Sequence, residues 1–526
     1  MNVLSIPPAL LVLLTILLVL LVGLVVGGKV PLRYNARNLA VRWPLTLLTG
    51  LAFTLVLALL TVMLAFVNGM SRLTEDTGHP DNVVVLAEGS PDESGSSLPL
   101  SDTGDIDHQP GIKRWQSDAR SEPAGLCSRE LYLVANMPVP PKAGTTAGAQ
   151  LRGAVRKVDI DNGSLQMSDE QGAEHTVRLA DVGKVFANNL EGKLETLKPG
   201  DSIWLAYEER DKGLVATEIR GSNKRRFVQI RGIEDTGIAA QVHRLDLLPG
   251  GRWFSPAGVE ELPTASKKKA VPTAVQAVLG QGLAREMGHD VGKASLEVGD
   301  VFELGPKKWK VVGIMKSEGQ TFDSEIWAKR GYVGELFGKP NAISSIVIRA
   351  ESPDAASVLV TDLKDNYKKA NLQPLTEPEY FAKLSGMTTQ LRVGIVFLTF
   401  FMAVGGTLGV MNTMFAAISQ RAKDIGVLRI IGYARWQILV SFMLESLVIA
   451  LVGGLLGCAI GSLCNGVSAT SIVGGQGGFG KTVIFRLAVD PTTLGIGLVL
   501  TLAMGLVGGL LPSLSAMRLR PLESMR

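Results

Sequence analysis

The stretch Gln420-Arg-Ala-Lys-Asp-Ile-Gly-Val-Leu-Arg-Ile-Ile-Gly-Tyr-Ala-Arg435 is short, basic and amphipathic, and it lies between two long apolar runs. The run before it, residues 393–418, carries no charge, and the run after it, residues 438–464, carries only Glu445. A membrane-spanning helix needs about 20 consecutive, mainly apolar residues, so each run is long enough to cross a bilayer. Residues 391–465 are therefore predicted to form two spans joined by a turn at the membrane surface.

Two further apolar runs, residues 9–28 and 44–67, lie near the N-terminus and carry no charge. For residues 9–28 a cleaved signal peptide is the alternative to a spanning helix. Signal peptides begin with basic residues, and none precedes this run, so we expect a retained helix. A basic linker separates the two runs and contains Lys29, Arg33, Arg37 and Arg42.

Basic residues predict the orientation of the spans, because short loops rich in Lys and Arg remain in the cytoplasm. This rule places three segments in the cytoplasm: the basic linker, the turn at 419–436, and the basic tail that follows a last apolar run at 491–511. Five spans satisfy all of these basic clusters. The sequence thus predicts a multi-pass protein of the cell (inner) membrane, with residues 71–385 and the loop 465–489 outside the cytoplasm.

The segment outside the membrane has the composition of an α+β domain. Runs rich in β-branched residues at 81–86 and 343–349 predict strands, residues 301–314 predict a strand, a turn and a strand, and residues 355–370 have helical spacing. We divide the chain into an additional N-terminal span (1–28), a linker with the second span (29–70), a large extracytoplasmic domain (71–390) and a three-span domain (391–526).

Residues 150–221 form a distinct block within the extracytoplasmic domain. Residues 155–160 and 164–168 alternate between apolar and polar side chains, and Asp161-Asn-Gly163 supplies a turn between them. Residues 201–207 and 214–219 read as two further strands. Short strands at this spacing predict a small antiparallel β-barrel inserted into the larger domain.

Glycines recur at four-residue spacing in the last three spans. In lipid, small side chains on one helix face let two backbones approach each other, so this spacing predicts helix packing. The alternative is that glycine is simply common in membrane helices. The predicted packing residues are Gly405 and Gly409, then Gly453, Gly457 and Gly461, then Gly505 and Gly509.

Glu445 is the one acidic residue inside the span that follows the turn. Ionisable residues within membrane spans are costly and are candidates for a functional role. Because Glu445 lies about two helical turns from the cytoplasmic end, we expect its carboxylate to reach water or a basic partner.

The segment Gly475-Gln-Gly-Gly-Phe-Gly-Lys-Thr482 matches the P-loop pattern GxxxxGK[ST]. In a P-loop the backbone amides hold phosphates and the lysine reaches the terminal ones, but only between a strand and the start of a helix. This segment instead lies in a loop between two spans, outside the cytoplasm. We therefore interpret Gly475, Gly480, Lys481 and Thr482 as a false match and expect no cofactor site on this chain.

The composition argues against several other functions. Three cysteines and five scattered histidines show no metal-ligand spacing, so no metal site is expected. A net charge of +4 on 526 residues is too small to indicate a nucleic-acid partner. No arrangement of Ser, Cys, His or Asp indicates a catalytic site, and we expect the chain to be non-catalytic.

The three-span domain resembles the FtsX/MacB-type permeases of ABC transporters, a family with an FtsX-like permease domain and a MacB-like periplasmic core domain. The resemblance is carried by residues 409–414, 419–432, 438–445, 451–457 and 510–523. In the outer domain it is carried by residues 228–232, 251–254, 282–284, 298–300 and 312–313, and near the N-terminus by residues 32–39 and 43–48. Three features depart from the family: Asp424 stands where Glu is usual, the first span is additional to a four-helix core, and the barrel is an insertion.

The resemblance implies a permease that works as a homodimer or a pseudo-symmetric heterodimer, in contact with membrane lipid. A separate cytoplasmic ABC ATPase, which holds ATP and Mg, would be its partner, and a periplasmic adaptor protein is a further candidate. The turn would then be the coupling element between ATPase and permease, with contacts at Arg421, Asp424, Ile425, Gly426 and Arg429.

The implied function is export or extraction of a lipid, lipoprotein, peptide or small amphiphile, driven by movement of the extracytoplasmic domain. Two alternatives remain open at this point. The protein could be a mechanical signal transmitter that controls an extracytoplasmic cell-wall hydrolase or sensor, without transport. The basic turn could also serve only to set the topology of the spans.

Overall fold

The computed structural model describes residues 37, 41, 43–75, 78–116, 122–144, 149–169, 173–210, 213–262, 273–317, 320–384, 386–474 and 480–518. These residues form two compact units. The membrane unit contains the described parts of residues 1–72, 385–469 and 486–526, and the outer unit contains those of residues 73–384 and 470–485.

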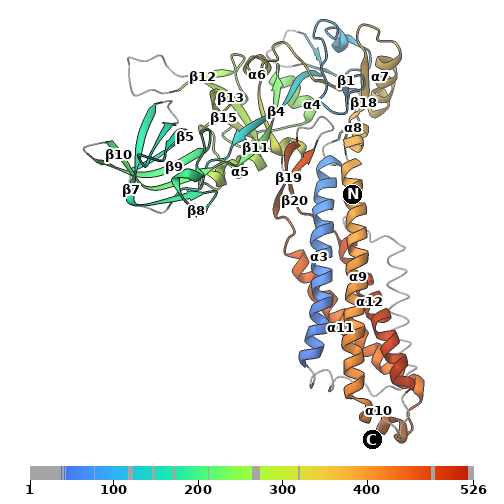
Figure 1. The fold of residues 1–526 in the computed structure, drawn as a ribbon. Helices are drawn as coiled ribbons and strands as arrows, with labels where there is room; N and C mark the ends of the chain where they lie inside the picture. The colour runs from blue at the N-terminus through green and yellow to red at the C-terminus, as the bar shows by residue number, and fades with distance from the viewer. Residues whose placement is uncertain are drawn as a thin grey trace. The chain divides into compact units, whose positions relative to one another are not determined.

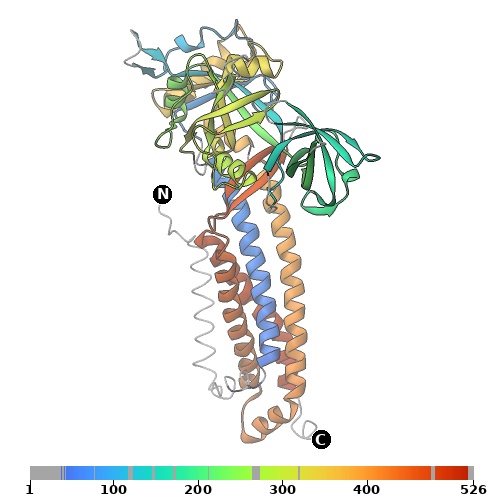
Figure 2. The same cartoon turned by 90° about the vertical axis from the view of Figure 1, so that its left-hand side faces the viewer.

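Four long helices make up most of the membrane unit (Figures 1 and 2): α3 (Trp43–Glu75), α9 (Gly386–Gln420), α11 (Arg435–Ser462) and α12 (Pro491–Arg518). Within the described part of the chain, these are the four helices that are long and apolar enough to cross a membrane. They correspond to four of the five predicted spans. The remaining one, residues 9–28, lies outside the described residues.

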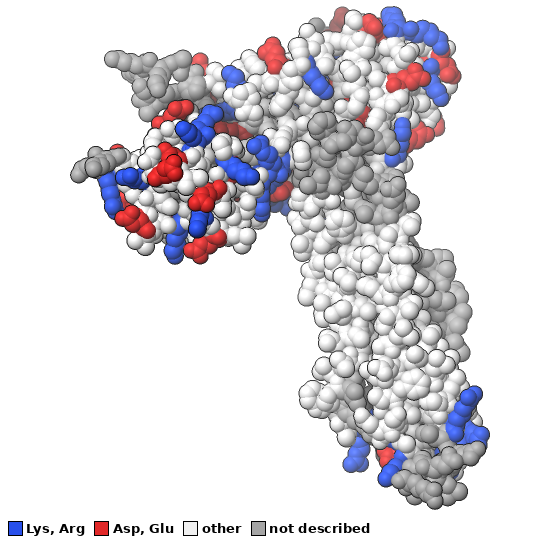
Figure 3. All heavy atoms as spheres, in the orientation of Figure 1, with Lys and Arg blue, Asp and Glu red and all other residues white. Residues whose placement is uncertain are grey.

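The core of the membrane unit draws on α3, α9, α11 and α12 and on the short helix α10 (Ala422–Ile431) between α9 and α11. Apolar side chains of the bundle meet in one buried cluster, which includes Phe53, Val410, Ile425, Phe442 and Met504. On the face shown in Figure 3 the long helices are free of charged side chains until the end where Figure 1 places α10. There basic residues gather, as expected for the cytoplasmic side of a membrane protein.

A ten-stranded mixed sheet forms the centre of the outer unit, in the order β14-β15-β13-β16-β11-β4-β17-β1-β18, with β12 paired to β13. The strands predicted at 81–86, 301–314 and 343–349 are confirmed as β1, β14 with β15, and β17. The strands are β1 (Asn82–Ala87), β4 (Cys127–Pro138), β11 (Arg225–Ile233), β12 (Val259–Glu261), β13 (Thr273–Gly280), β14 (Val301–Leu304), β15 (Lys307–Met315), β16 (Glu325–Lys329), β17 (Ser345–Arg349) and β18 (Leu372–Thr376).

Short helices cover the sheet, and the helix predicted at 355–370 is α7, which begins two residues earlier and ends at Asp365. The helices are α4 (Thr236–His243), α5 (Gln281–Asp290), α6 (Arg330–Leu336), α7 (Pro353–Asp365) and α8 (Glu377–Leu384), with single 3-10 turns at η1 (Ile106–His108), η2 (Leu194–Thr196) and η3 (Thr321–Ser324). A small separate ribbon pairs β2 (Arg114–Trp115) with β3 (Ala124–Gly125).

The inserted block is a closed barrel, as the alternating pattern predicted. Its strands follow the order β10-β9-β5-β6-β7, and β7 pairs with β10 to close the circle. The closing pair is parallel, so the prediction of a wholly antiparallel barrel is wrong at this one seam. The strands are β5 (Ala149–Asp159), β6 (Ser164–Asp169), β7 (Glu174–Ala187), β8 (Leu190–Gly192), β9 (Ser202–Arg210) and β10 (Gly213–Ser222).

The barrel interrupts a pair of neighbouring strands of the large sheet. Strand β4 enters the insertion and β11 leaves it, and these two strands pair antiparallel with Pro138 opposite Arg225. The two ends of the insertion therefore lie side by side. A whole domain can replace the hairpin turn at this point without disturbing the register of the sheet.

The described part of residues 470–485 belongs to the outer unit, although the sequence predicts a loop of the three-span domain there. They include most of a hairpin formed by β19 (Ser468–Gly474) and β20 (Gly480–Arg486). Ile484 joins the core of the large sheet, and its amide donates a hydrogen bond of 2.8 Å to Ser324 Oγ.

Candidate functional site: a helix between two spans and a pocket in the outer unit

The predicted turn at 419–436 is a short helix with defined ends. Arg421 occupies the N-cap position of α10, and Gly432 ends the helix with a φ of 110°. Only glycine adopts this left-handed conformation without strain, so Gly432 is suited to reverse the chain into α11. The amide of Ala434 then donates a 2.8 Å hydrogen bond to Gln437 Oε1 and fixes the start of α11.

One face of α10 is anchored in the membrane unit. Ile425 is 2% exposed and packs in the apolar cluster with Ile418, Ile438 and Phe442. Gly426 is also buried. Because these contacts involve residues of α9 and α11, α10 is held by both helices that it connects.

A buried ion pair also fixes the start of α10. Arg421 Nη1 and Nη2 donate hydrogen bonds of 2.6 and 2.8 Å to the two carboxylate oxygens of Glu445, and both residues are buried. The guanidinium carbon also lies 5.7 Å from the ring centre of Phe442. Of the two partners expected for Glu445, water or a basic residue, the structure shows the basic one. A two-fold hydrogen-bonded pair of this kind fixes orientation as well as distance, because both planar groups must align.

The opposite face of α10 carries an exposed apolar patch. Val427, Ile430 and Ile431 are 45%, 61% and 69% exposed, and their spacing places them on one side of the helix. Lys423 and Asp424 are exposed beside them. Exposed isoleucines on a short helix between two membrane helices, next to charged residues, have the composition of a protein-binding surface.

The five residues that were expected to contact an ATPase therefore divide into two groups. Asp424 is exposed and Arg429 is half-buried, with its Nη1 atom buried and without a hydrogen-bond partner among the described residues. Arg421, Ile425 and Gly426 are buried, so the structure places them as residues that position α10 and not as its outer surface. The apolar patch was missed by the sequence reasoning, although helical spacing would have revealed it.

The glycines of α11 face α3 at short range. A Cβ added to Gly453 would lie 2.6 Å from the carbonyl oxygen of Gly50, and one added to Gly457 would lie 2.8 Å from that of Thr54. At Gly461 the neighbour is the Cβ of Thr61, at 2.6 Å. These distances are too short for any side chain, and the two backbones can approach because the side chains are absent.

Two glycines of α12 also lie in helix contacts. A Cβ added to Gly505 would lie 2.6 Å from Ala450 Cβ, and one added to Gly509 would lie 2.7 Å from Ser446 Cβ. Gly405 and Gly409 of α9 differ, since an added Cβ would meet none of the described residues within 4 Å. The glycine of α9 that makes contact is Gly406, where an added Cβ would lie 2.4 Å from Met504 Cε.

The residues of the P-loop-like segment are placed differently from those of a P-loop. Gly480, Lys481 and Thr482 belong to strand β20, and Gly475 lies outside the described residues. A P-loop requires the lysine and the hydroxyl residue at the start of a helix, where backbone amides point toward the phosphate. Here a strand of a two-stranded hairpin occupies that position.

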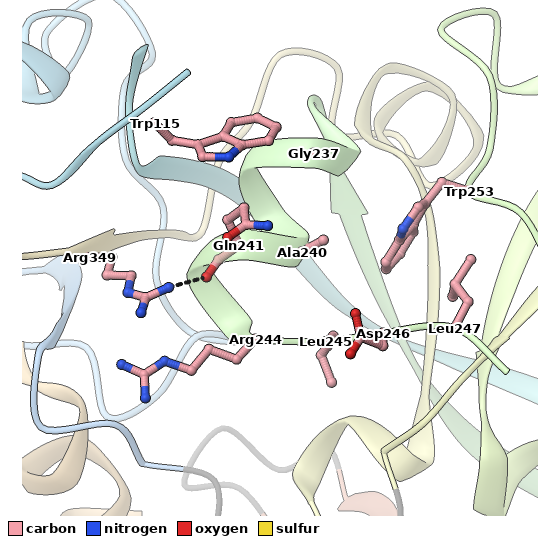
Figure 4. A pocket seen from close by; sticks show the side chains of 10 residues that line it. All are labelled: Trp115, Gly237, Ala240, Gln241, Arg244, Leu245, Asp246, Leu247, Trp253 and Arg349. Atoms are coloured by element: carbon pink, nitrogen blue, oxygen red, sulfur yellow. Dashed lines mark hydrogen bonds between the residues drawn. The ribbon is translucent and has the colours of Figure 1, made fainter. Parts of the chain in front are cut away.

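A pocket of about 500 Å³ lies around α4 in the outer unit (Figure 4). The indole rings of Trp115 and Trp253 line it, together with Leu245 and Leu247. Charged groups line it as well: Arg244, Arg349 and Asp246.

The two arginines of the pocket share one carboxylate. Arg244 Nη2 donates to both oxygens of Asp81, at 2.6 and 2.5 Å, while Arg349 Nε lies 3.4 Å from the same group and its Nη1 donates to the Gln241 carbonyl. Aromatic surface thus lies next to a partly compensated positive charge, an arrangement suited to a molecule with apolar and charged parts.

Two family models match the chain. Residues 396–521 match the C-terminal domain of the FtsX-like permeases, and residues 205–366 match the MacB-like periplasmic core domain. The first match includes α10 and most of the three C-terminal spans, and the second includes the pocket residues from Gly237 to Arg349. The resemblance seen in the sequence is therefore confirmed in both regions, as is the location: a multi-pass membrane protein with a large extracytoplasmic domain.

Curated relatives give the same result. The chain is 29% identical to an uncharacterized ABC transporter permease of Methanocaldococcus jannaschii, over 47% of this chain and 61% of the relative. It is 27% identical to the macrolide export ATP-binding/permease protein MacB of Agrobacterium fabrum, over 65% and 51%, and 25% identical to the uncharacterized ABC transporter permease YknZ of Bacillus subtilis, over 46% and 60%. The chain thus spans between half and about three fifths of the length of these relatives.

Proposed function

We propose that this chain, with its FtsX-like permease and MacB-like periplasmic core regions, is the permease subunit of an ABC transporter driven by a separate cytoplasmic ATPase. The observation that supports this most is the construction of α10. Its inner face is held by Ile425 and by the Arg421–Glu445 pair, while Val427, Ile430 and Ile431 are exposed on its outer face. A helix that is both firmly held and exposed can receive a force and pass it on.

The proposed mechanism is movement of α10 together with the spans that it joins. ATP binding and hydrolysis, with Mg, would take place on the partner ATPase and change the distance between its two copies. Because the ion pair fixes α10 to α11 and the Ile425 cluster includes residues of α9, displacement of α10 moves these helices as a rigid body. The amino end of α9 follows α8 of the outer unit after a single intervening residue, so this motion would be delivered to the outer unit.

The proposed substrate is a lipid, lipoprotein, peptide or small amphiphile that is exported or extracted on the outer side. The pocket around α4, with its tryptophans beside arginines, supports a molecule with both apolar and charged parts. One relative is described as a macrolide exporter, which concerns that protein and is in keeping with an amphiphilic substrate here. A dimer of permeases and a periplasmic adaptor would complete the assembly. The comparisons do not favour the alternative of a signal transmitter without transport.

The substitution Ile430→Asp tests the proposed ATPase surface. A charge at the centre of the apolar patch should weaken binding of the ATPase by at least tenfold, because desolvated residues at the centre of an interface contribute most of the affinity. Co-purification of an ABC ATPase co-expressed from the same source measures this, together with ATP-dependent release of substrate from proteoliposomes.

The matched control is Ile160→Asp, since Ile160 is 57% exposed but lies in the barrel of the outer unit. The control should retain the ATPase. A second variant, Asp424→Lys, reverses the charge beside the patch. An intact complex with full activity in both Ile430→Asp and Asp424→Lys would rule out α10 as the receiving element.

A further inference from the structure

Two chain segments connect the outer unit to membrane helices, and they pack against each other. Residues 78–82 follow α3, and α8 precedes α9. A Cβ added to Gly78 would lie 3.3 Å from Pro378 Cα, so the two segments touch along their backbones. We call residues 78–82 together with Glu377 the junction.

Glu377 holds the junction together by two hydrogen bonds. Its Oε2 atom accepts one from the His79 amide, at 2.8 Å, and one from Asn82 Nδ2, at 3.1 Å. Asn82 Nδ2 also donates to the carbonyl oxygen of Val242 in α4, at 3.1 Å. A single carboxylate thus links the segment after α3 to the segment before α9, and Asn82 extends this link to α4.

The two side chains that join the junction are buried, and polar atoms near them lack hydrogen-bond partners among the described residues. Glu377 and Asn82 are 2% and 0% exposed. Asn82 Oδ1 and His243 Nδ1 are both buried and have no hydrogen-bond partner among the described residues. Unpaired polar atoms in a protein interior are costly, and their presence around one carboxyl indicates a site where a proton can change the hydrogen bonding.

The charges near Glu377 sum to an excess of negative charge. His243 Nε2 lies 2.7 Å from Glu130 Oε1, and Glu130 also contacts Arg231. Arg231 in turn pairs with two further buried carboxylates. The buried charge cluster thus consists of six groups: Glu93, Glu130, Arg231, His243, Glu325 and Glu377. When all six are ionised, four carboxylates face two cations, and one added proton reduces the excess of negative charge.

A second group of charges lies beside His79. Burial lowers the pKa of the His79 imidazole, and Arg244, His243 and Arg349 lower it further, while Asp81 opposes them. Arg244, Arg349 and Asp81, two cations and one anion, pair with one another and carry a net charge of +1. This offsets only part of the cluster's excess of two negative charges.

We propose that Glu377 is a proton-binding residue of the outer unit, and that its protonation tightens the junction between the segments that lead to α3 and α9. An ionised Glu377 adds a fourth negative charge to a buried cluster and favours opening of the junction to water. A protonated Glu377 removes that charge and can remain buried with the junction closed.

The pKa values of Glu377 and His243 are both raised, so both groups favour a closed junction at low pH. Burial raises the pKa of Glu377 to about 7, although His243 and the two hydrogen bonds act in the other direction. Burial disfavours the charged form of His243, but the adjacent Glu130 outweighs it and raises the His243 pKa above its usual value.

Both groups therefore hold protons more firmly in the closed junction than in water. The proton on Glu377 stabilises the closed junction fully below pH 4.5, the ordinary pKa of this group, and this stabilisation is lost as pH rises through about 7. The proton on His243 stabilises the closed junction fully below pH 6.5, its ordinary pKa, and this stabilisation is lost as pH rises through its raised pKa. Between pH 5 and pH 8 these two effects have the same sign, while the lowered pKa of His79 acts in the opposite direction as pH falls through 6.5. Because the shift of Glu377 is the large one, the junction should close as pH falls.

Hydrogen exchange of the full chain in lipid nanodiscs tests the proposal. After correction for the intrinsic pH dependence of exchange, the opening equilibrium of peptides that cover residues 78–87 and 372–384 should rise on the order of tenfold from pH 5.5 to pH 7.5. In Glu377→Gln, which keeps a similar shape but cannot titrate, most of this rise should disappear. The matched control is Glu379→Gln, an exposed carboxylate two residues further along α8, and it should behave as the unaltered protein.

Infrared spectroscopy gives a second, independent measurement. The unaltered protein should show the carbonyl stretch of one buried, protonated carboxyl that disappears with a midpoint near pH 7, and Glu377→Gln should lack it. An opening equilibrium that does not change with pH, or an unchanged pH dependence in Glu377→Gln, overturns the proposal. If that variant does not fold, absence of the titrating band from the unaltered protein overturns it. None of these measurements requires an ATPase, so they are independent of the proposed transport function.

Discussion

The membrane unit and the outer unit each bury charged side chains, but they balance them differently. In the membrane unit, one cation faces one anion, and both carboxylate oxygens of Glu445 are bonded to Arg421. In the outer unit, Arg231 contacts three carboxylates at once, and the whole cluster keeps an excess of negative charge. The matched pair serves to hold two helices in one orientation, whereas the unmatched cluster leaves room for a proton.

The difference follows from the surroundings of the two sites. Within a bilayer an unpaired charge has no nearby water, so a stable arrangement pairs each charge completely. The outer unit is a water-exposed domain that can open locally, and an excess charge there is tolerated at the cost of a shifted pKa. A fully paired buried charge thus suits the transmission of force between helices, and an excess of buried negative charge suits a response to pH.

The largest expected effect comes from removing the cation of the cluster. The substitution Arg231→Leu leaves Glu93, Glu130 and Glu325 without their common partner, and we expect the outer unit to lose on the order of 5 kcal/mol of stability. Thermal unfolding of the purified chain, followed by near-UV circular dichroism, measures this. An unfolding temperature close to that of the unaltered protein would mean that the cluster does not depend on Arg231.

A smaller effect is expected when the membrane pair is broken. Either Arg421→Leu or Glu445→Leu alone leaves one buried charge without its partner, at a cost of about 3 kcal/mol. The double variant with both leucines removes both charges and should recover most of this stability, because a buried ion pair contributes little more than an apolar pair of similar size.

The double variant also separates stability from transmission. Although it should unfold at nearly the original temperature in detergent, it lacks the two directed hydrogen bonds that orient α10, so the coupling of ATP hydrolysis to substrate release should fall. If the double variant couples as well as the unaltered protein, the pair is needed for stability alone.

The smallest expected effect concerns the glycines that bring α11 to α3. In Gly457→Ala the new methyl group would meet the Thr54 carbonyl oxygen at 2.8 Å, and we expect a loss of about 1–3 kcal/mol as the helices separate. Gly409→Ala is the matched control, because an added Cβ there meets nothing within 4 Å of the described residues. Equal unfolding temperatures for the two variants would contradict close packing of α3 on α11.

Local patterns in the sequence predicted much of the fold. Hydropathy located the four described spans at α3, α9, α11 and α12, with ends that differ from the helix ends by at most eight residues, because span length and composition are properties of single segments. The alternation of apolar and polar side chains located barrel strands such as β6 (Ser164–Asp169), because this pattern is also a property of a single segment. The parallel seam between β7 and β10 escaped prediction, since closure joins strands that are distant in the chain.

The candidate site was predicted less completely than the fold. The sequence placed the turn between the correct spans, but it could not distinguish buried Arg421 from exposed Asp424, since this depends on the rotation of α10 about its own axis. The same limitation explains why Gly405 and Gly409 were chosen as packing residues in place of Gly406.

The sequence by itself determined the positions of the four described spans and of the short helix between two of them, and it predicted their orientation, because hydropathy and basic residues act locally. Only the tertiary structure decided which groups meet: Arg421 with Glu445, 24 residues apart, and Asn82 with Glu377, 295 residues apart. Such contacts depend on how helices rotate and how distant segments pack. No repeat or motif within one segment encodes this information.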